Sequence, residues 1–208
     1  YEPSPDWFKA IVNKTPTVTF NPTSAAILQR HGIRVDIVIP HGIDTDFFKP
    51  DYSKRDGITI MTHTAWPEQP TKGMHILSRA LGIAGVKAKC WSGVPREAIR
   101  DALQTATIHI FPSTYQEMYG LVGAEAMACG CACIASDVAG CRYQIENGVR
   151  GLLVPPRDPQ ALAKAIRYML DNPIEREQMA QTGLAWVQQN GTLEIMGKRY
   201  EAFYEQLQ

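Results

Sequence analysis

Two glutamates eight positions apart, Glu117 and Glu125, stand in a segment whose layout is suited to binding an anion. Between them, Gly120 comes just before an apolar helical run, and glycine lets the backbone approach a ligand closely. Free amides at the start of a helix, together with the helix dipole, form a site that can hold a diphosphate. The amides concerned belong to Gly120, Leu121 and Val122.

The two glutamates suit different parts of a nucleotide-like ligand. Glu125 lies among small and apolar helical residues, where a carboxylate is costly unless its oxygens accept hydrogen bonds. A ribose diol offers two hydroxyl donors for that purpose. Glu117 lies in the preceding loop, nearer the place where a sugar beyond the phosphates would sit. The alternative, that both are solvated surface acids, is less favoured by their placement.

The elements that would hold these residues alternate between strand-like and helix-like hydrophobic patterns. Strands are predicted at 58–61, 86–91, 108–111, 132–136 and 151–154, with helices at 73–81, 95–104, 121–128, from 158 onward, and twice more before the end. Apolar strands each followed by a helix indicate an α/β fold, a parallel sheet with helices on both faces. Ahead of it, strands at 17–20 and 35–40 with a helix between them form a short partial βαβ segment.

Composition excludes several classes of protein. The 208 residues carry 21 basic and 21 acidic side chains, and this zero net charge argues against a nucleic-acid partner. No apolar run is long enough for a transmembrane segment, so we expect a cytoplasmic protein, with peripheral membrane attachment left open. The five cysteines are expected to be reduced core thiols. Their C-x-C-x-C spacing does not suit zinc, so neither a metal nor a cofactor is expected.

Longer stretches of the sequence resemble the retaining, family 4 (group 1) glycosyltransferases. EMYGLVGAEAMACGCACIASDVAG at 117–140 is similar to that family's E-x(7)-E segment, and NGVRGLLVPPRDPQALAKAI at 147–166 to the segment that follows it. IPHGIDTDFFKP at 39–50 resembles the family's linker between lobes, and Lys72-Gly73 its K-G pair. The resemblance covers roughly residues 35–170.

The resemblance implies a set of roles for individual residues. It implies a Rossmann-like C-terminal lobe of a GT-B fold, which binds a sugar nucleotide without a required metal ion. Lys72 would neutralise the leaving diphosphate, Glu117 would contact the donor sugar and Glu125 would hold the ribose. Further donor contacts are implied for Met118, Tyr119, Gly120, Leu121, Val122, His63, Gly93, Val94 and Gly140.

Four of these further positions either depart from the family pattern or keep two interpretations. His63 falls nearest the position where the family places an arginine, and the segment from Ile58 to Lys72 contains none. Gly93 and Val94 are interpreted as what remains of a nucleobase pocket in a shortened middle region. Gly140 is either a turn glycine or a point of close approach to the ligand.

The same resemblance predicts how the chain is divided and what it does. Residues 1–50 are expected to be a remnant of the N-terminal acceptor lobe, 51–190 the donor-binding domain, and 191–208 a helix that packs back toward the N-terminal lobe. We expect a hexosyltransferase that uses a UDP-, GDP- or ADP-sugar, retains configuration and acts on an unknown acceptor.

Because the rest of the acceptor lobe is missing, the isolated chain is expected to be inactive, with that lobe supplied by a parent chain or a partner. The alternative is a non-catalytic sugar-nucleotide-binding or scaffold domain. A dinucleotide-binding oxidoreductase is disfavoured, because no G-x-G-x-x-G follows a predicted strand.

Overall fold

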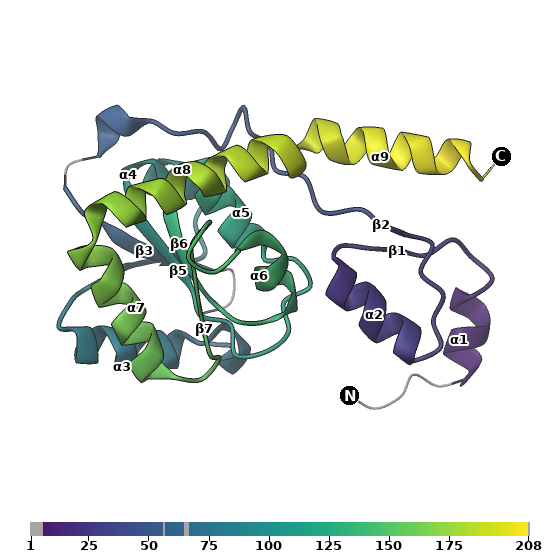
Figure 1. The fold of residues 1–208 in the computed structure, drawn as a ribbon, viewed down its shortest axis with the longest axis horizontal. Helices are drawn as coiled ribbons and strands as arrows, with labels where there is room; N and C mark the ends of the chain where they lie inside the picture. The colour runs from purple at the N-terminus through teal and green to yellow at the C-terminus, as the bar shows by residue number, and fades with distance from the viewer. Residues whose placement is uncertain (1–5, 56, 65–66, 208) are drawn as a thin grey trace.

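The computed structural model describes residues 6–55, 57–64 and 67–207, and its centre is a five-stranded sheet in the order β4-β3-β5-β6-β7 (Figure 1). The strands are β3 (Ile60–His63), β4 (Lys89–Trp91), β5 (Ile108–Phe111), β6 (Ala132–Ser136) and β7 (Leu152–Val154). Every neighbouring pair in this sheet is parallel. The predicted α/β class with a parallel sheet is confirmed.

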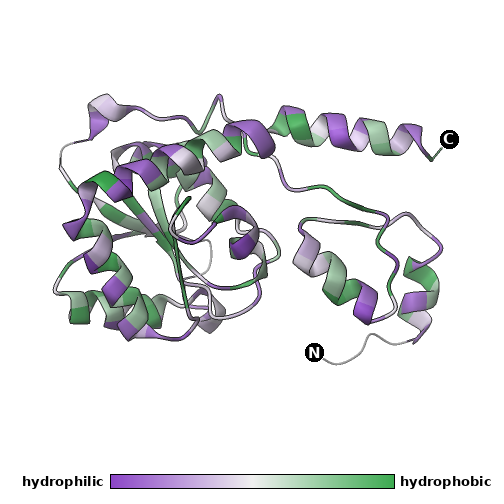
Figure 2. Cartoon of the chain, in the orientation of Figure 1, coloured by the Kyte–Doolittle hydropathy of each residue, from purple (hydrophilic) through white to green (hydrophobic). Residues whose placement is uncertain are grey.

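Helices cover both faces of this sheet, as predicted. One hydrophobic cluster joins the strands to α3 (Met74–Ala84) and α7 (Pro159–Asp171), and a second joins them to α4 (Arg96–Thr105), α5 (Leu121–Ala128) and α6 (Ala139–Gln144). The long helix α8 (Pro173–Asn190) contributes to both clusters. β5 and β6 are buried along their whole length, and apart from His109 and Ser136 their residues are apolar (Figure 2).

The N-terminal part of the described chain forms a separate small unit beside the sheet (Figure 1). It consists of α1 (Asp6–Val12), β1 (Val18–Thr19), α2 (Pro22–Arg30) and β2 (Ile37–Val38), with β1 and β2 paired in parallel. Asn21 caps α2, since its Oδ1 accepts a hydrogen bond of 2.8 Å from the Ser24 amide. Its Nδ2 donates to the carbonyl of Met118, which ties α2 to the loop before α5.

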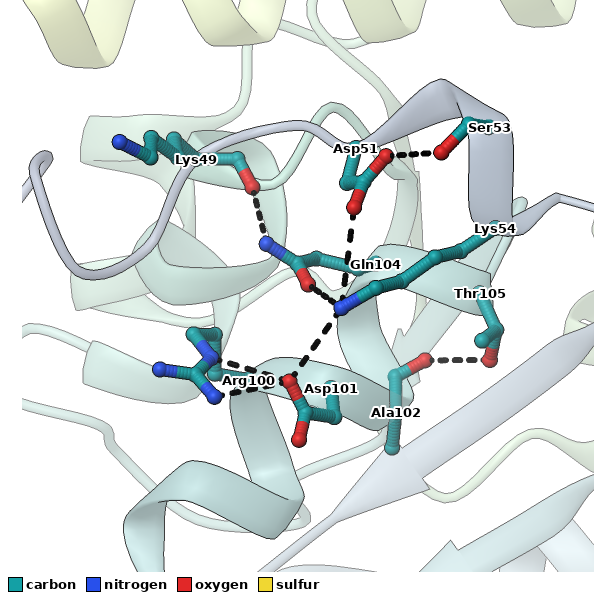
Figure 3. Close-up of polar contacts among 9 residues, drawn as sticks. All are labelled: Lys49, Asp51, Ser53, Lys54, Arg100, Asp101, Ala102, Gln104 and Thr105. Atoms are coloured by element: carbon teal, nitrogen blue, oxygen red, sulfur yellow. Dashed lines mark hydrogen bonds and ion pairs between the residues drawn. The ribbon is translucent and has the colours of Figure 1, made fainter.

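A polar cluster fixes the segment that leads from the N-terminal unit into the sheet (Figure 3). Gln104 of α4 is buried, and its Nε2 donates to the Lys49 carbonyl at 3.0 Å. Its Oε1 accepts from Lys54 Nζ at 2.6 Å, at the end of the short helix η1 (Tyr52–Lys54). Lys54 also lies 3.7 Å from Asp51 and 3.5 Å from Asp101, so one lysine joins the connection to α4.

The last helix, α9 (Leu193–Glu205), extends away from the five-stranded sheet past β2 (Figure 1). Its start is bound to the connecting segment, because the amide of Ile43 donates to Gly191 O at 2.7 Å and the amide of Leu193 donates to Ile43 O at 3.1 Å. Among the residues of α9, Phe203 alone is buried.

The predicted domain limits at residues 50 and 190 stay predictions. Within the described ranges, no helix is both long and apolar enough to cross a membrane.

Candidate functional site

Lys72 and Glu117 meet at the carboxyl ends of two neighbouring strands. Lys72 ends the short helix η2 (Pro70–Lys72) after β3, and Glu117 lies in the loop between β5 and α5. Their side chains are 45 positions apart in sequence, and Lys72 Nζ lies 2.7 Å from Glu117 Oε1. Ser113 Oγ donates to the same oxygen at 2.7 Å. Parallel strands bring their carboxyl ends to one edge of a sheet, and this edge is where such sheets bind ligands.

Glycine at position 73 allows the two loops to approach each other. Gly73 has φ 71°, and an added Cβ would lie 1.8 Å from the carbonyl oxygen of Pro112. Beside this contact, the amide of Thr114 donates to Thr71 O at 2.8 Å. The local structure thus explains why a glycine follows Lys72, and it fixes the lysine relative to the loop that carries Glu117.

The loop and the start of α5 enclose a cavity of about 370 Å³. Its walls are formed by His41, Thr64, Lys72, Gln116, Glu117, Met118, Tyr119, Gly120, Leu121 and Val122. Gly120, with φ 88°, is the N-cap of α5, so the first amides of the helix have no acceptor within it. A lysine and a helix N-terminus on one cavity provide the two kinds of group that bind a diphosphate.

His41 closes the cavity from the connecting segment. Its ring stacks on Phe20 with centroids 3.9 Å apart and meets the edge of Tyr119 at 5.4 Å. Burial lowers the pKa of His41 below its ordinary 6.5, so this imidazole is neutral at neutral pH. Lys72 is therefore the fixed positive charge among the residues that form the cavity walls.

Glu125 lies one turn further along α5, with its side chain 16% exposed. Its Oε2 is 3.0 Å from His63 Nε2, and His63 Nδ1 is 3.1 Å from His109 Nε2. Its Oε1 is 4.0 Å from a guanidinium nitrogen of Arg96, which sits over the ring of Phe48. Both ring nitrogens of His63 thus lie within hydrogen-bond distance of other side chains, and the expectation that His63 replaces an arginine at the phosphates stays a prediction.

The remaining predicted contacts lie outside the cavity wall. Gly140 lies beneath the site loop, where an added Cβ would be 2.6 Å from Glu117 O, and its amide donates to that oxygen at 2.8 Å. Gly140 thus supports the loop through close packing, and its contact with a donor stays a prediction. Gly93 and Val94 form an exposed turn between β4 and α4.

Five residues of the site are not among those predicted from sequence: His41, Thr64 and Gln116 in the cavity wall, Ser113 beside Glu117, and Arg96 beside Glu125. His41 could have been found in the linker motif, but Arg96 and Ser113 carry no sequence signal. Among the described residues, no group of three or more His, Cys, Asp or Glu is arranged to hold a metal ion.

A larger cavity of about 580 Å³ lies on the other side of the loop, between α2 and the ends of β6 and β7. Its walls include Arg30, Tyr115, Asp137 and Arg157, and none of Lys72, Glu117 or Glu125. We place the candidate site in the smaller cavity, because that is where the cation, the carboxylate and the helix N-terminus converge.

Comparison with known proteins agrees with this fold. Residues 75–186 match the family described as Glycosyl transferases group 1, and the chain belongs to that family. The D-inositol 3-phosphate glycosyltransferase 1 of Catenulispora acidiphila is 36% identical over 107 residues, which are 51% of this chain and 24% of that protein. The corresponding enzyme of Streptomyces griseus subsp. griseus is 34% identical over 120 residues, 58% of this chain and 25% of that protein.

Solved structures show the same fold over almost the whole chain. Sucrose-phosphate synthase from Thermosynechococcus elongatus has a TM-score of 0.86 at 24% identity, covering 96% of this chain and 60% of that one. Anabaena HepE in complex with UDP-glucose has a TM-score of 0.84 at 19% identity, covering 95% of this chain and 66% of that one. The fold is that of GT-B glycosyltransferases, and the predicted family and fold class are confirmed. The matched segment spans about a quarter of the curated relatives' length.

Proposed function

We propose that this chain binds the donor in a glycosyltransferase reaction, in which a hexose passes from a nucleoside diphosphate sugar to an acceptor with retention of configuration. The observation that carries the proposal is the convergence of Lys72, Glu117 and the N-terminus of α5 on one cavity. Departure of the diphosphate leaves negative charge on its oxygens and a positively charged, oxocarbenium-like sugar. Fixed N–H groups and a lysine directed at the phosphates stabilise that charge distribution.

The two carboxylates would act at opposite ends of the diphosphate. Glu117 uses Oε1 to bind both Lys72 and Ser113, which leaves Oε2 to accept a hydroxyl of the donor sugar. Glu125, one helical turn beyond the anion site, would accept hydroxyls of the ribose. Arg96, whose side chain is 58% exposed, would supply a second cation near that end of the nucleotide.

The names of similar proteins support a nucleotide-sugar donor. The HepE structures contain UDP-glucose, UDP with glucose, or UDP. We propose UDP as the first candidate base, with GDP and ADP as alternatives. The acceptor would be bound chiefly by a further lobe in a parent chain or partner, since the N-terminal unit described above contributes only two short strands. The 208-residue chain is therefore expected to bind nucleotide and to transfer little sugar.

Calorimetric titration of the chain with UDP, GDP and ADP tests this proposal. We expect one of them to bind, and Glu125→Ala to weaken binding by roughly tenfold or more, because a hydrogen-bonded charged group is lost. The exposed Glu146, which pairs with Arg150 at 3.0 Å, provides a matched glutamate-to-alanine control that should leave affinity unchanged. Failure of all three nucleotides to bind at millimolar concentration would reject a donor site in this chain.

A further inference from the structure

A chain of three side chains connects the buried centre of the sheet to Glu125. His109 lies on β5 and is fully buried, His63 lies at the end of β3 and is 7% exposed, and Glu125 lies on α5. The two contacts, His109 Nε2 to His63 Nδ1 at 3.1 Å and His63 Nε2 to Glu125 Oε2 at 3.0 Å, are both within hydrogen-bond distance. The donor and the acceptor in each contact follow from which atoms of the three side chains can carry a proton.

A carboxylate oxygen only accepts hydrogen bonds, so His63 Nε2 carries a proton and donates it to Glu125. In a neutral ring, His63 Nδ1 is then a lone pair, and His109 Nε2 must be the donor to it. This places a lone pair on His109 Nδ1, the ring nitrogen for which the described residues provide no hydrogen-bond partner. Within the described part of the chain, this arrangement leaves one unpaired acceptor and no unpaired donor on the two imidazole rings.

The other arrangements are more costly. If His63 were charged, its Nδ1 proton would point at His109 Nε2, and the proton of His109 would move to Nδ1 as a buried donor without an acceptor. If His109 were charged, a full charge would lie in the middle of the sheet. Burial holds the pKa of His109 well below its ordinary 6.5, with the neighbouring His63 as a second cause. The hydrogen bonds therefore run from His109 through His63 to Glu125, with the carboxylate as the final acceptor and a neutral His109 as the first donor.

We propose that His109 is a positioning residue: by donating to His63 it fixes the ring that binds Glu125 Oε2, and so holds Glu125 Oε1 for a ligand hydroxyl. The inference deepens the proposed function, because the hydroxyl it assigns to Glu125 is that of a nucleotide ribose. A histidine that only filled space would not need a donor at Nε2. Its ring also stacks on Phe111, with centroids 5.7 Å apart, so packing and hydrogen bonding must be separated by experiment.

Two substitutions separate the packing of His109 from its hydrogen bonding. His109→Phe keeps an aromatic ring against Phe111 but removes the donor, whereas His109→Gln loses the ring but keeps an amide donor with similar reach. The first measurement is ¹⁵N NMR of the imidazole nitrogens in the ligand-free chain at pH 7.5. We expect the Nε2–H tautomer at both His63 and His109. His109→Phe should shift the ¹⁵N resonance of His63 Nδ1, because that nitrogen loses its hydrogen-bond donor, and His109→Gln should restore most of the wild-type position.

The second measurement is the ratio of dissociation constants for 2′-deoxy-UDP and UDP, repeated with the guanine and adenine pairs. We expect the wild-type chain to prefer the ribonucleotide by about tenfold, the value of one hydrogen bond to a charged group. His109→Phe should bring the ratio close to one, and His109→Gln should restore most of it. Lys72→Ala should weaken both ligands equally and leave the ratio unchanged.

The two measurements distinguish a failure of the positioning role from a failure of the proposed function. An Nδ1–H or charged His63 in the wild-type chain, or a wild-type ratio retained in His109→Phe, would overturn the positioning role. If the wild-type chain binds none of the nucleotides, the proposed function is rejected. The ¹⁵N resonances of the ligand-free chain would then still decide whether His109 donates to His63 Nδ1.

Discussion

Replacing Gly73 with alanine should separate the two loops that bring Lys72 and Glu117 together. An added Cβ would lie 1.8 Å from Pro112 O, whereas ordinary contacts begin at 3.4 Å, so the loops would have to part by about 1.6 Å. Such a movement would break the Thr114 to Thr71 hydrogen bond, at a cost of about 1 kcal/mol. Alanine at a left-handed φ of 71° costs about another 1–2 kcal/mol.

We therefore expect the Gly73→Ala chain to lose about 2–4 kcal/mol in free energy of unfolding, measured as a lower midpoint in urea at unchanged slope. The 2.7 Å contact between Lys72 Nζ and Glu117 Oε1 would lengthen with the same movement. Affinity for the nucleoside diphosphate should fall by roughly tenfold or more in the fraction that remains folded, because the lysine would be displaced from the phosphates.

Two other glycines of the same region separate the backbone cost of an added Cβ from its packing cost. Gly85 has a similar φ of 66°, but no described atom lies within 4 Å of its added Cβ, so Gly85→Ala should show the backbone cost alone. Gly82, inside α3, has open space among the described atoms and no such φ, so Gly82→Ala should be neutral or stabilising by up to about 1 kcal/mol. If Gly73→Ala is no less stable than Gly85→Ala, the packing of Gly73 against Pro112 is wrong.

Three further predictions concern the core. Gln104→Ala should lower the free energy of unfolding by about 1–3 kcal/mol in urea, since its buried amide binds both Lys49 O and Lys54; an unchanged midpoint would contradict this. Burial raises the pKa of Cys131 from 9.0 to about 12, so the unfolded chain loses that proton first and stability should fall between pH 9 and pH 12. Cys131→Ala should make the free energy of unfolding fall less steeply with pH in this range, by up to about 1.4 kcal/mol per pH unit. An equal slope in the variant and the wild-type chain would refute this prediction. Because the pKa of His109 is lowered, the unfolded chain takes up a proton that the folded chain does not, so stability should fall as pH drops below 6.5. His109→Gln should weaken that acid loss in pH-dependent denaturation, and a loss of wild-type size would count against the buried neutral ring.

Those elements that carry a strong local signal were predictable from sequence. The predicted spans of β5, α5 and β6 coincide with Ile108–Phe111, Leu121–Ala128 and Ala132–Ser136, because apolar runs bounded by glycine or polar residues define them. The helix α6 was not predicted. It has six residues and no side-chain cap, and the hydrogen bond from Gly140 to Glu117 O holds it from outside the helix. Both strands of the N-terminal unit are shorter than predicted, since only two residues of each pair with the other.

The site was predictable as a set of residues but not as a geometry. The E-x(7)-E segment identified Glu117 and Glu125, and the K-G pair identified Lys72. Nothing local in the sequence indicates that His63 binds Glu125. That contact depends on β3 pairing with β5, where Met61 lies opposite His109, and on α5 packing over both strands. The approach of Arg96 to Glu125 from α4 likewise arises only from tertiary structure.

The most direct test of the central claim is an amide NMR titration of the chain with UDP, GDP and ADP, which reports where the diphosphate sits. We predict that the binding nucleotide shifts the amides of Leu121 and Val122 most, at the start of α5, together with Gly73 beside Lys72. We also expect Lys72→Ala to reduce these shifts at a given nucleotide concentration. Shifts centred instead on Arg157 and the larger cavity, or no shifts with any of the three, would contradict the placement of the donor site.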